Sequence, residues 1–589
     1  MKVKQAIYRV LSWRTRHIND RQFIIFLSIV VGVAVGFAAV LIKNLVHFIQ
    51  TQLEDLTIDK NNYLYFIYPM VGISLVVLFI RYINRRSVGH GIPSVLYAIS
   101  KNNGLLHQHN LYSSIISSSL TVGFGGSVGL EGPTVATGAA IGSNVGRWLH
   151  LSYRQVILLL GCASAGAMAA IFKAPIAAIV FALEVIMLDL TMAALVPLLL
   201  SSATAALTSY FFLGQNVLYS FSIQEPFNLN ELHFYLIFGV LTGLVCVYFT
   251  KIYLLITGLF EKIKRKSHRL FIGGSILGLL VFLLPSLYGE GYEIINQSLH
   301  GDYSYLQGSI LHELLGESFL GIAILLIIIL LMKVVATSVT FGSGGVGGIF
   351  APTLFTGTTT GLLFANIFNR MGFDLSTSNF AFVGMAGLIA GVIHAPLTAI
   401  FLIAEITGGY QLFMPLMLVS TISYATVRVF VSNSVYTIQL AKRGELMTHH
   451  KDKALLMLMK VEDLIERDFN TISPSDSLGE LVKIIAKAHR NIFPVVEEDN
   501  TFRGIVKLDD IRNIIFKPEM YDKVHVKDIM FMPEYTVIIN ENMEEVAQKF
   551  QVSGRFNIAV VKEGKYMGFI SRAKTFSSYR KILKDFSEH

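Results

Sequence analysis

The stretch GFGGSVGLEGPTVATG, from Gly123 to Gly138, decides the fold of this chain. Its first half is too rich in glycine to continue a helix, whereas the residues after Pro133 favour one, and proline is preferred in the first helical turn. Strongly apolar sequence lies on both sides of this stretch. We therefore predict a helix whose N-terminus lies inside a lipid bilayer rather than at its surface.

A second stretch, FGSGGVGGIFAP (Phe341–Pro352), repeats this organisation. The string PTVATG at Pro133 recurs as PTLFTG at Pro352, and APIAAIVFALEV recurs as APLTAIFLIAEI, both at an offset of about 220 residues. Two matched pairs in the same order indicate a duplicated unit. We predict an all-α polytopic membrane protein with two inverted-topology repeats, roughly 24–214 and 232–438, built from discontinuous helices.

Composition agrees with a membrane protein: 53% of the 589 residues are hydrophobic and 15% are charged. Basic clusters at Arg81–Arg86 and Lys262–Arg269 predict cytoplasmic loops, so the net charge of +8 requires no nucleic-acid partner. We find no cleavable signal peptide and expect a multi-pass protein of the cell (inner) membrane, surrounded by lipid, with both termini cytoplasmic. Two cysteines, Cys162 and Cys246, in apolar surroundings support neither a disulfide framework nor a metal site.

Charged residues become frequent after Ala441, and short β-rich runs then alternate with amphipathic stretches. We predict a membrane domain over residues 1–440, a linker over 441–457 and an α/β cytosolic tail. The tail contains two similar segments, as FPVVEEDNTFRGIVKLDDI resembles IAVVKEGKYMGFISRAKT. We place the first tail domain at 458–518 and the second at 524–586.

One carboxylate stands out in the first glycine-rich stretch. Glu131 lies two positions before Pro133, and a carboxylate at membrane depth is costly unless it has a function. Free N–H groups and the positive end of the helix dipole form an anion site without requiring a lysine or arginine. The ionised Glu131 side chain can occupy such a site in place of a free anion, so we predict that it acts as a gate. The alternative is a buried structural carboxylate.

Four strings, GHGIP (Gly89–Pro93), GLEGP (Gly129–Pro133), GGIFAP (Gly347–Pro352) and SVYTIQL (Ser434–Leu440), resemble the anion-binding segments of the CLC chloride channel and transporter family in order and spacing. The resemblance covers essentially the whole membrane domain. It implies transport of chloride or another small anion by a homodimer with one pathway in each subunit and Glu131 as the external gate. The residues that it assigns to the anion are His90, Gly91, Ile92, Gly129, Gly132, Gly348, Ile349, Phe350 and Tyr436.

Three positions depart from the family pattern. His90 replaces a serine, so its imidazole either contacts the anion or turns outward while the amides of Gly91 and Ile92 bind it. Leu130 replaces a basic residue, which weakens attraction of anions to the outer mouth. Val185 occupies the position of the glutamate that passes protons in family exchangers, and valine accepts no proton.

Val185 therefore favours passive, channel-like chloride conductance over the alternative, a proton-coupled chloride antiporter. A fluoride exporter and a membrane-embedded nucleotide sensor are weaker alternatives, and we expect no enzyme activity. Glu184 and Glu405 lie at matching positions of the two repeats, where we expect a packing or helix-terminating role. Lys173, Lys333 and His394 are expected at solvated or snorkelling positions.

The tail resembles a tandem pair of CBS domains, which implies sensing of an adenine nucleotide. The nucleotide-contacting end of each repeat usually joins a serine or threonine with an aspartate. This chain keeps one feature in each repeat, Asp510 in the first and Ser571 in the second. We expect chloride as the bound ligand, no required cofactor or metal, and either nucleotide binding at Asp510 and Ser571 or a purely structural tail.

Overall fold

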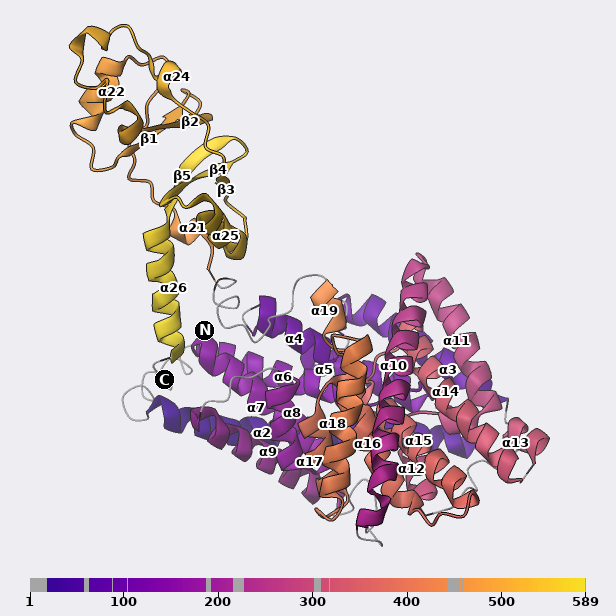
Figure 1. The fold of residues 1–589 in the computed structure, drawn as a ribbon. Coiled ribbons are helices and arrows are strands. Elements are labelled where there is room, and N and C mark those ends of the chain that lie inside the picture. Colours follow the sequence, from indigo (N-terminus) through magenta and orange to yellow (C-terminus); the bar gives the residue numbers. More distant parts are fainter. Residues whose placement is uncertain are drawn as a thin grey trace, which may run out of the picture. The chain divides into compact units, whose positions relative to one another are not determined.

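The computed structural model describes residues 19–57, 63–86, 88–89, 91–102, 104–186, 192–214, 227–300, 309–316, 318–442, 456 and 459–587. It divides the chain into two compact units, Met1–Leu446 and Met447–His589. The first unit is helical, and the second carries two small sheets (Figure 1).

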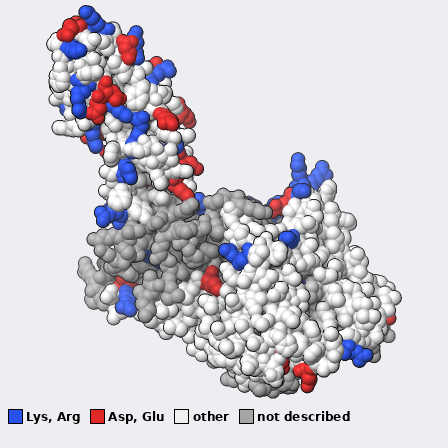
Figure 2. All heavy atoms as spheres, in the orientation of Figure 1, with Lys and Arg blue, Asp and Glu red and all other residues white. Residues whose placement is uncertain are grey.

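Eight helices in the described ranges are long and apolar enough to cross a membrane. Figure 2 shows that most of the visible described surface of the first unit carries neither acidic nor basic residues, whereas both are scattered over the second unit. The predicted fold class, a helical polytopic membrane domain followed by an α/β tail, is confirmed.

The helices of the first repeat are α2 (Asp20–Thr57), α3 (Leu64–Leu78), α4 (Ile92–Lys101), α5 (Asn110–Gly123), α6 (Glu131–Trp148), α7 (Tyr153–Phe172), α8 (Pro175–Glu184) and α9 (Met192–Leu213). Those of the second are α10 (Leu232–Lys262), α11 (Lys266–Leu283), α12 (Tyr292–Leu299), α13 (Ile310–Leu315), α14 (Phe319–Ser343), α15 (Phe350–Arg370), α16 (Thr377–Ile393), α17 (Pro396–Ile406) and α18 (Phe413–Phe430), followed by α19 (Ile438–Lys442). A π-helical turn, Phe79–Asn84, extends α3, and a 3-10 turn, Pro285–Leu287, follows α11.

The two repeats pack their helices in the same way. Helix α6 packs on α7 as α15 packs on α16, and α2 packs on α9 as α10 packs on α18. Glycine permits the closest contacts, because a Cβ on Gly357 of α15 would lie 2.5 Å from the carbonyl oxygen of Gly384 in α16. Helices α7 and α16 both end on a residue with positive φ, Lys173 (56°) and His394 (62°), at equivalent places. The duplication read from sequence is therefore a structural one.

The tail unit contains two segments of the same build. In the first, α22 (Leu478–Ile485) precedes the antiparallel pair β1 (Ile492–Val496) and β2 (Phe502–Lys507). In the second, β3 (Thr536–Ile538) runs parallel to β4 (Asn557–Lys562), which pairs antiparallel with β5 (Lys565–Ser571). The remaining helices of the tail unit are α21 (Val461–Leu464), α23 (Leu508–Ile511), α24 (Val526–Ile529), α25 (Met543–Ser553) and α26 (Arg572–Ser587), with a 3-10 turn at Pro518–Met520.

Each tail segment receives one β-bridge from a residue that precedes the other segment. Glu466, which precedes the first segment, pairs with Phe569 in β5 through backbone hydrogen bonds of 2.7 and 2.9 Å. Phe531, which precedes the second segment, pairs in the same way with Ile505 in β2, at 2.9 and 3.0 Å. Because each segment completes the other, the pair forms one folded body.

Candidate anion pathway

The two glycine-rich stretches meet at a single backbone bridge. The N–H of Gly129 donates to the carbonyl of Gly348 at 2.8 Å, and the N–H of Gly348 donates to the carbonyl of Gly129 at 2.7 Å. These residues occupy equivalent positions in the two repeats. The bridge brings the N-termini of α6 and α15 together in the interior of the membrane unit, as the glycine pattern predicts.

Glu131 is the first residue of α6 and is fully buried, at 0% exposure. Its Oε1 accepts a hydrogen bond from the Tyr292 hydroxyl. Its Oε2 is buried without a hydrogen bond of good geometry in the described part of the chain, and it lies against Gly129 and Gly348. The carboxylate therefore lies between the two helix N-termini, facing neither hydrocarbon nor bulk solvent.

The predicted anion contacts of the second half are near the Glu131 carboxylate. Ile349 and Phe350 form the N-cap and first residue of α15 and are 2% and 0% exposed. The backbone of Ala351 interacts with the carboxylate. The Tyr436 hydroxyl is buried, lacks a hydrogen-bond partner among the described residues, and is close enough to feel the charge of Glu131. A hydroxyl in this position can donate to an anion.

The GHGIP segment is described in part. Gly91 has φ +66° and caps α4, and a Cβ at this position would lie 2.9 Å from the carbonyl carbon of Gly132. The start of α4, including the buried Ile92, therefore packs on the first turn of α6. His90 lies outside the described residues. The two readings of its imidazole therefore both stay predictions.

Four residues near Glu131 were not selected by the sequence reasoning as site residues. Tyr292 holds the carboxylate, and Oε1 of the neighbouring Glu290 accepts from the N–H of Leu130 at 3.1 Å. Lys43 donates to the carbonyl of Ile171 at 2.9 Å, and its charge acts on both carboxylates. The fourth is Lys333. Glu290 and Tyr292 could have been selected from the sequence, because the GEGYE string at 289–293 again places polar residues next to glycines.

The expectation of a solvated or snorkelling Lys333 is wrong. This side chain is fully buried in α14, where its ammonium group donates to the carbonyl of Gly289 at 3.1 Å and lies 4.8 Å from the centre of the Phe355 ring. Lys173 is also mostly buried, at 8% exposure, and donates to the carbonyl of Gly214 at 2.7 Å. Backbone carbonyls and aromatic rings replace water around both cations.

Glu184 and Glu405 bind each other's helices. Glu184, the last residue of α8, accepts from the N–H groups of Leu397 and Thr398 at 3.2 and 2.8 Å and from the Thr398 hydroxyl at 2.7 Å. Glu405, near the end of α17, accepts from the N–H groups of Ile176 and Ala177 at 3.1 and 2.7 Å. The C-terminal end of each helix thus meets the N-terminal end of the other. This is the geometry that an inverted repeat requires.

The expected structural role of both glutamates agrees with these contacts, because each stands at or next to the end of its own helix and caps the N-terminus of the partner helix. Val185, the C-cap of α8, is 6% exposed. Its side chain is apolar, so at this position it adds neither a charge nor a proton acceptor to the membrane unit.

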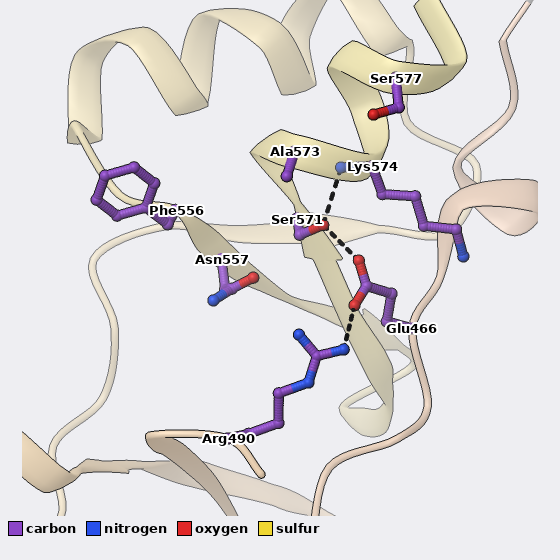
Figure 3. A pocket seen from close by; sticks show the side chains of 8 residues that line it. All are labelled: Glu466, Arg490, Phe556, Asn557, Ser571, Ala573, Lys574 and Ser577. Carbon is purple, nitrogen blue, oxygen red and sulfur yellow. Dashed lines mark hydrogen bonds and ion pairs between the residues drawn. The ribbon is translucent and has the colours of Figure 1, made fainter.

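The tail has a cavity of about 640 Å³ around Ser571 (Figure 3). Glu466 lies at its centre, where it accepts from the Ser571 hydroxyl and pairs with Arg490 at 2.8 Å. The Lys574 ammonium group donates instead to the carbonyl of Ile465 at 3.3 Å. Arg490, Ser571 and Lys574, three of the groups that could bind an anion, thus already have partners within the protein.

Asp510 does not line this cavity. It is exposed on α23 of the first segment, at the position equivalent to Lys574. Lys507, three residues before Asp510, lies over the Phe531 ring together with Arg555, 5.2 and 5.7 Å from its centre. The two residues predicted to contact nucleotide thus belong to two symmetry-related places in the tail rather than to one pocket.

Comparison with known proteins agrees with this geometry. Residues 72–428 match the family described as voltage gated chloride channel, and residues 461–517 match the CBS domain. The chain is 31% identical over 384 residues to a putative chloride channel protein ClcB-like of Ralstonia nicotianae, covering 64% of this chain and 85% of that one. It is 27% identical over 452 residues to the H(+)/Cl(-) exchange transporter ClcA of Vibrio vulnificus, covering 74% and 92%.

A solved structure of a slow cyanobacterial Cl⁻/H⁺ antiporter superposes with a TM-score of 0.63 at 22% identity, covering 72% of this chain and 98% of that one. This likeness supports the fold of the membrane unit. The family match spans most of the membrane unit, and it includes Glu131, Phe350 and the bridge between Gly129 and Gly348. The chain is a multi-pass membrane protein of the CLC family, the voltage-gated chloride channels and their transporter relatives, and it carries a C-terminal CBS tail.

Proposed function

We propose that this CLC protein conducts chloride passively through a pathway that the Glu131 carboxylate closes and its protonation opens. The single observation that carries the gate is the position of this buried carboxylate between the N-termini of α6 and α15. A halide and an ionised carboxylate would compete for the same N–H groups. A protonated carboxyl group carries no charge and binds these N–H groups more weakly, so the anion takes its place.

Position 185 holds a valine instead of a carboxylate that could bind and release a proton, which supports chloride conduction over proton-coupled exchange. Val185 cannot take a proton, and the adjacent Glu184 already accepts three hydrogen bonds from α17. Moving a proton through Glu184 would break these bonds in every cycle, which is costly for a partly buried group. Proton-coupled exchange is the second candidate, because the Vibrio vulnificus relative is named as an H(+)/Cl(-) exchange transporter.

The purified protein in planar lipid bilayers separates the two mechanisms. Under opposed chloride and proton gradients, we expect the reversal potential to follow the chloride gradient alone and to stay constant when the pH difference is changed. A reversal potential that moves with the pH difference would establish exchange instead. The same measurement with fluoride replacing chloride tests the fluoride alternative, which predicts a much larger current with fluoride.

For the tail we propose weak binding of an adenine nucleotide in the cavity around Ser571, with Arg490 as the phosphate contact and Glu466 as a competing internal anion. Calorimetry of the full-length protein with AMP and with ATP tests this proposal. We expect Glu466→Gln to tighten binding about tenfold, because it releases Arg490 from an ion pair and removes a repelling charge. If neither the parent nor Glu466→Gln gives a measurable heat of binding with AMP or ATP, the proposal is wrong and the tail has a structural role only.

We also propose a homodimer in the cell membrane with cytoplasmic termini. The family resemblance supports the dimer, and the basic clusters at Arg81–Arg86 and Lys262–Arg269 support the orientation. Mass photometry of the detergent-solubilised protein tests the first statement. Labelling of single cysteines introduced into the two clusters, from one side of the membrane, tests the second.

A further inference from the structure

A cavity of about 270 Å³ lies close to the gate, between the end of α2, the start of α3 and the segment that joins α11 to α12. The helices α2, α3 and α11 each have one end at this cavity and the other end next to a sequence that is predicted to be cytoplasmic. Helix α3 leads from the cavity to Arg85 and Arg86, and α11 leads from Lys266 to the cavity. By the positive-inside rule the cavity belongs to the outer face.

The lining of this cavity is unusual for an anion pathway. It contains three carboxylates and four tyrosines, with no lysine or arginine among its described residues. Such a lining repels anions and attracts cations, of which the proton is the smallest. The described residues also contain no group of three His, Cys, Asp or Glu side chains arranged to hold a metal ion. The ionisable lining residues are Glu54, Tyr65, Tyr68, Tyr288, Glu290, Tyr292 and Glu293.

Two lining residues connect the cavity directly to the gate. The Tyr292 hydroxyl donates to Oε1 of Glu131, so the cavity and the buried carboxylate are one hydrogen bond apart. Glu290 accepts from the N–H of Leu130, the residue before the gate, and the charge of Glu131 acts on Glu290. Tyr292 therefore stabilises the ionised Glu131 carboxylate, and ionisation of either carboxylate, Glu131 or Glu290, disfavours ionisation of the other.

The other charges around this pair come from three helices. Lys43 and Glu54 belong to α2, Lys333 belongs to α14, and Glu293 follows Tyr292 in α12. Lys43 and Lys333 both act on Glu290, and Lys43 also acts on Glu131. Two cations thus partly balance the two carboxylates, which allows either carboxylate to change its protonation without leaving a large net charge in the site.

We propose that Tyr292 and Glu290 are positioning residues of the Glu131 gate and that they form the inner end of a path by which protons from the outer solution reach it. This inference rests on the gate proposed above. On opening, the Glu131 carboxylate takes up one proton from the cavity side, becomes neutral and releases its position to chloride. On closing, the same proton returns to the outer solution and the hydrogen bond from Tyr292 re-forms.

Substitutions of Tyr292 and Glu290 are expected to shift the pH dependence of the chloride current in opposite directions. Without the hydroxyl, in Tyr292→Phe, the ionised carboxylate loses its donor, so the outer pH at which half of the maximal current flows moves about one unit toward alkaline. Glu290→Gln removes the carboxyl group that competes with Glu131 for ionisation, so the same midpoint moves about one unit toward acid. Glu290→Asp keeps the charge and should stay near the parent midpoint.

The test measures chloride current in planar bilayers with the pH set separately on the two sides. We expect the parent to respond to outer pH at constant inner pH, and both variants to shift that response in the stated directions. Glu313→Gln is the matched control, because Glu313 is an exposed carboxylate on α13 that does not line the cavity. It should leave the midpoint unchanged. Equal elution volume and melting temperature establish that each variant is folded.

Glu131→Gln separates this inference from the proposed function. If that variant keeps the response to pH, the gate itself is wrong and the inference fails with it. If that variant loses the response while Tyr292→Phe and Glu290→Gln keep the parent midpoint, only the outer path is wrong. A parent that responds to inner pH alone would also overturn the path and leave the gate in place.

Discussion

Helices α6 and α15 begin at equivalent positions of the two repeats with different side chains. Glu131 opens α6 and Phe350 opens α15, and their backbones meet at the bridge between Gly129 and Gly348. Both helix ends present N–H groups to the same interior region. Only the first repeat adds a carboxylate. Under the proposed function, duplicated backbone forms the anion site and one side-chain position, that of Glu131, makes half of it a gate.

The largest effect is expected for Glu131→Gln. Glutamine has nearly the same shape but carries no charge, so it competes poorly with chloride for the N–H groups. We expect the chloride efflux rate from liposomes at neutral pH to rise about 10- to 100-fold, and its acid activation to disappear.

Phe350→Leu is the control for that change at the equivalent position of the second repeat. It keeps an apolar residue at the start of α15 and should leave the acid activation as in the parent. Acid activation that survives in Glu131→Gln, or vanishes in Phe350→Leu, would contradict the assigned difference between the repeats.

Replacing each of the two bridge glycines, Gly129 and Gly348, by alanine tests how much each repeat contributes to the stability of the bridge. A Cβ on Gly348 would lie 2.8 Å from the backbone nitrogen of Gly132, which cannot move without shifting α6. A Cβ on Gly129 would instead overlap mainly the carboxylate of Glu131, the end of a side chain that can rotate away, and would also lie 2.9 Å from the Cβ of Ala351.

We therefore expect Gly348→Ala to cost about 3 kcal/mol and Gly129→Ala about 1 kcal/mol in the free energy of unfolding. Denaturation in detergent measures both values. Gly129→Ala should also raise chloride efflux, because it displaces the gate. Equal losses of stability would show that the bridge is less rigid than its two hydrogen bonds indicate.

The smallest difference is expected between Glu184→Ala and Glu405→Ala. Glu184 accepts three hydrogen bonds from α17 and Glu405 accepts two from α8. Loss of the capping carboxylate leaves N–H groups in the first turn of the partner helix without a partner. We expect a loss of about 3 kcal/mol for Glu184→Ala and about 2 kcal/mol for Glu405→Ala.

Melting temperatures in detergent provide this comparison, with the glutamine variants as controls that keep a carbonyl acceptor. Neither alanine variant should change the reversal potential of the surviving protein. A shift for Glu184→Ala with the pH difference would instead indicate that Glu184 carries protons.

Much of the membrane fold could be predicted, because the duplicated strings carry their own evidence. Pro133 and Pro352 mark the helix starts, and glycines before them exclude a continuous helix. Glu131 could be selected because a carboxylate in such a stretch is costly without a function. The equivalence of Glu184 and Glu405 was also visible, but their exchange of helix caps required knowledge of which helix ends meet.

The rest depended on contacts between distant parts of the chain. Lys333 read as a snorkelling residue because only the fold shows that carbonyls at Leu287 and Gly289 surround it. In the tail, sequence similarity suggested a contact to nucleotide at Ser571, whereas the folded tail engages this hydroxyl with Glu466, more than one hundred residues earlier. Pairings over such distances leave no periodic signal.

By itself the sequence determined the membrane class, the duplication, the helix starts and the position of the carboxylate proposed as the gate, because hydrophobicity, glycine and proline act locally on the backbone. Tertiary structure alone decided what surrounds that carboxylate: Tyr292 as donor, Glu290 and Lys43 as neighbouring charges, and the glycine bridge beneath it. The physical reason is that the energy of a buried charge depends on groups within a few ångströms in space, whatever their separation along the chain.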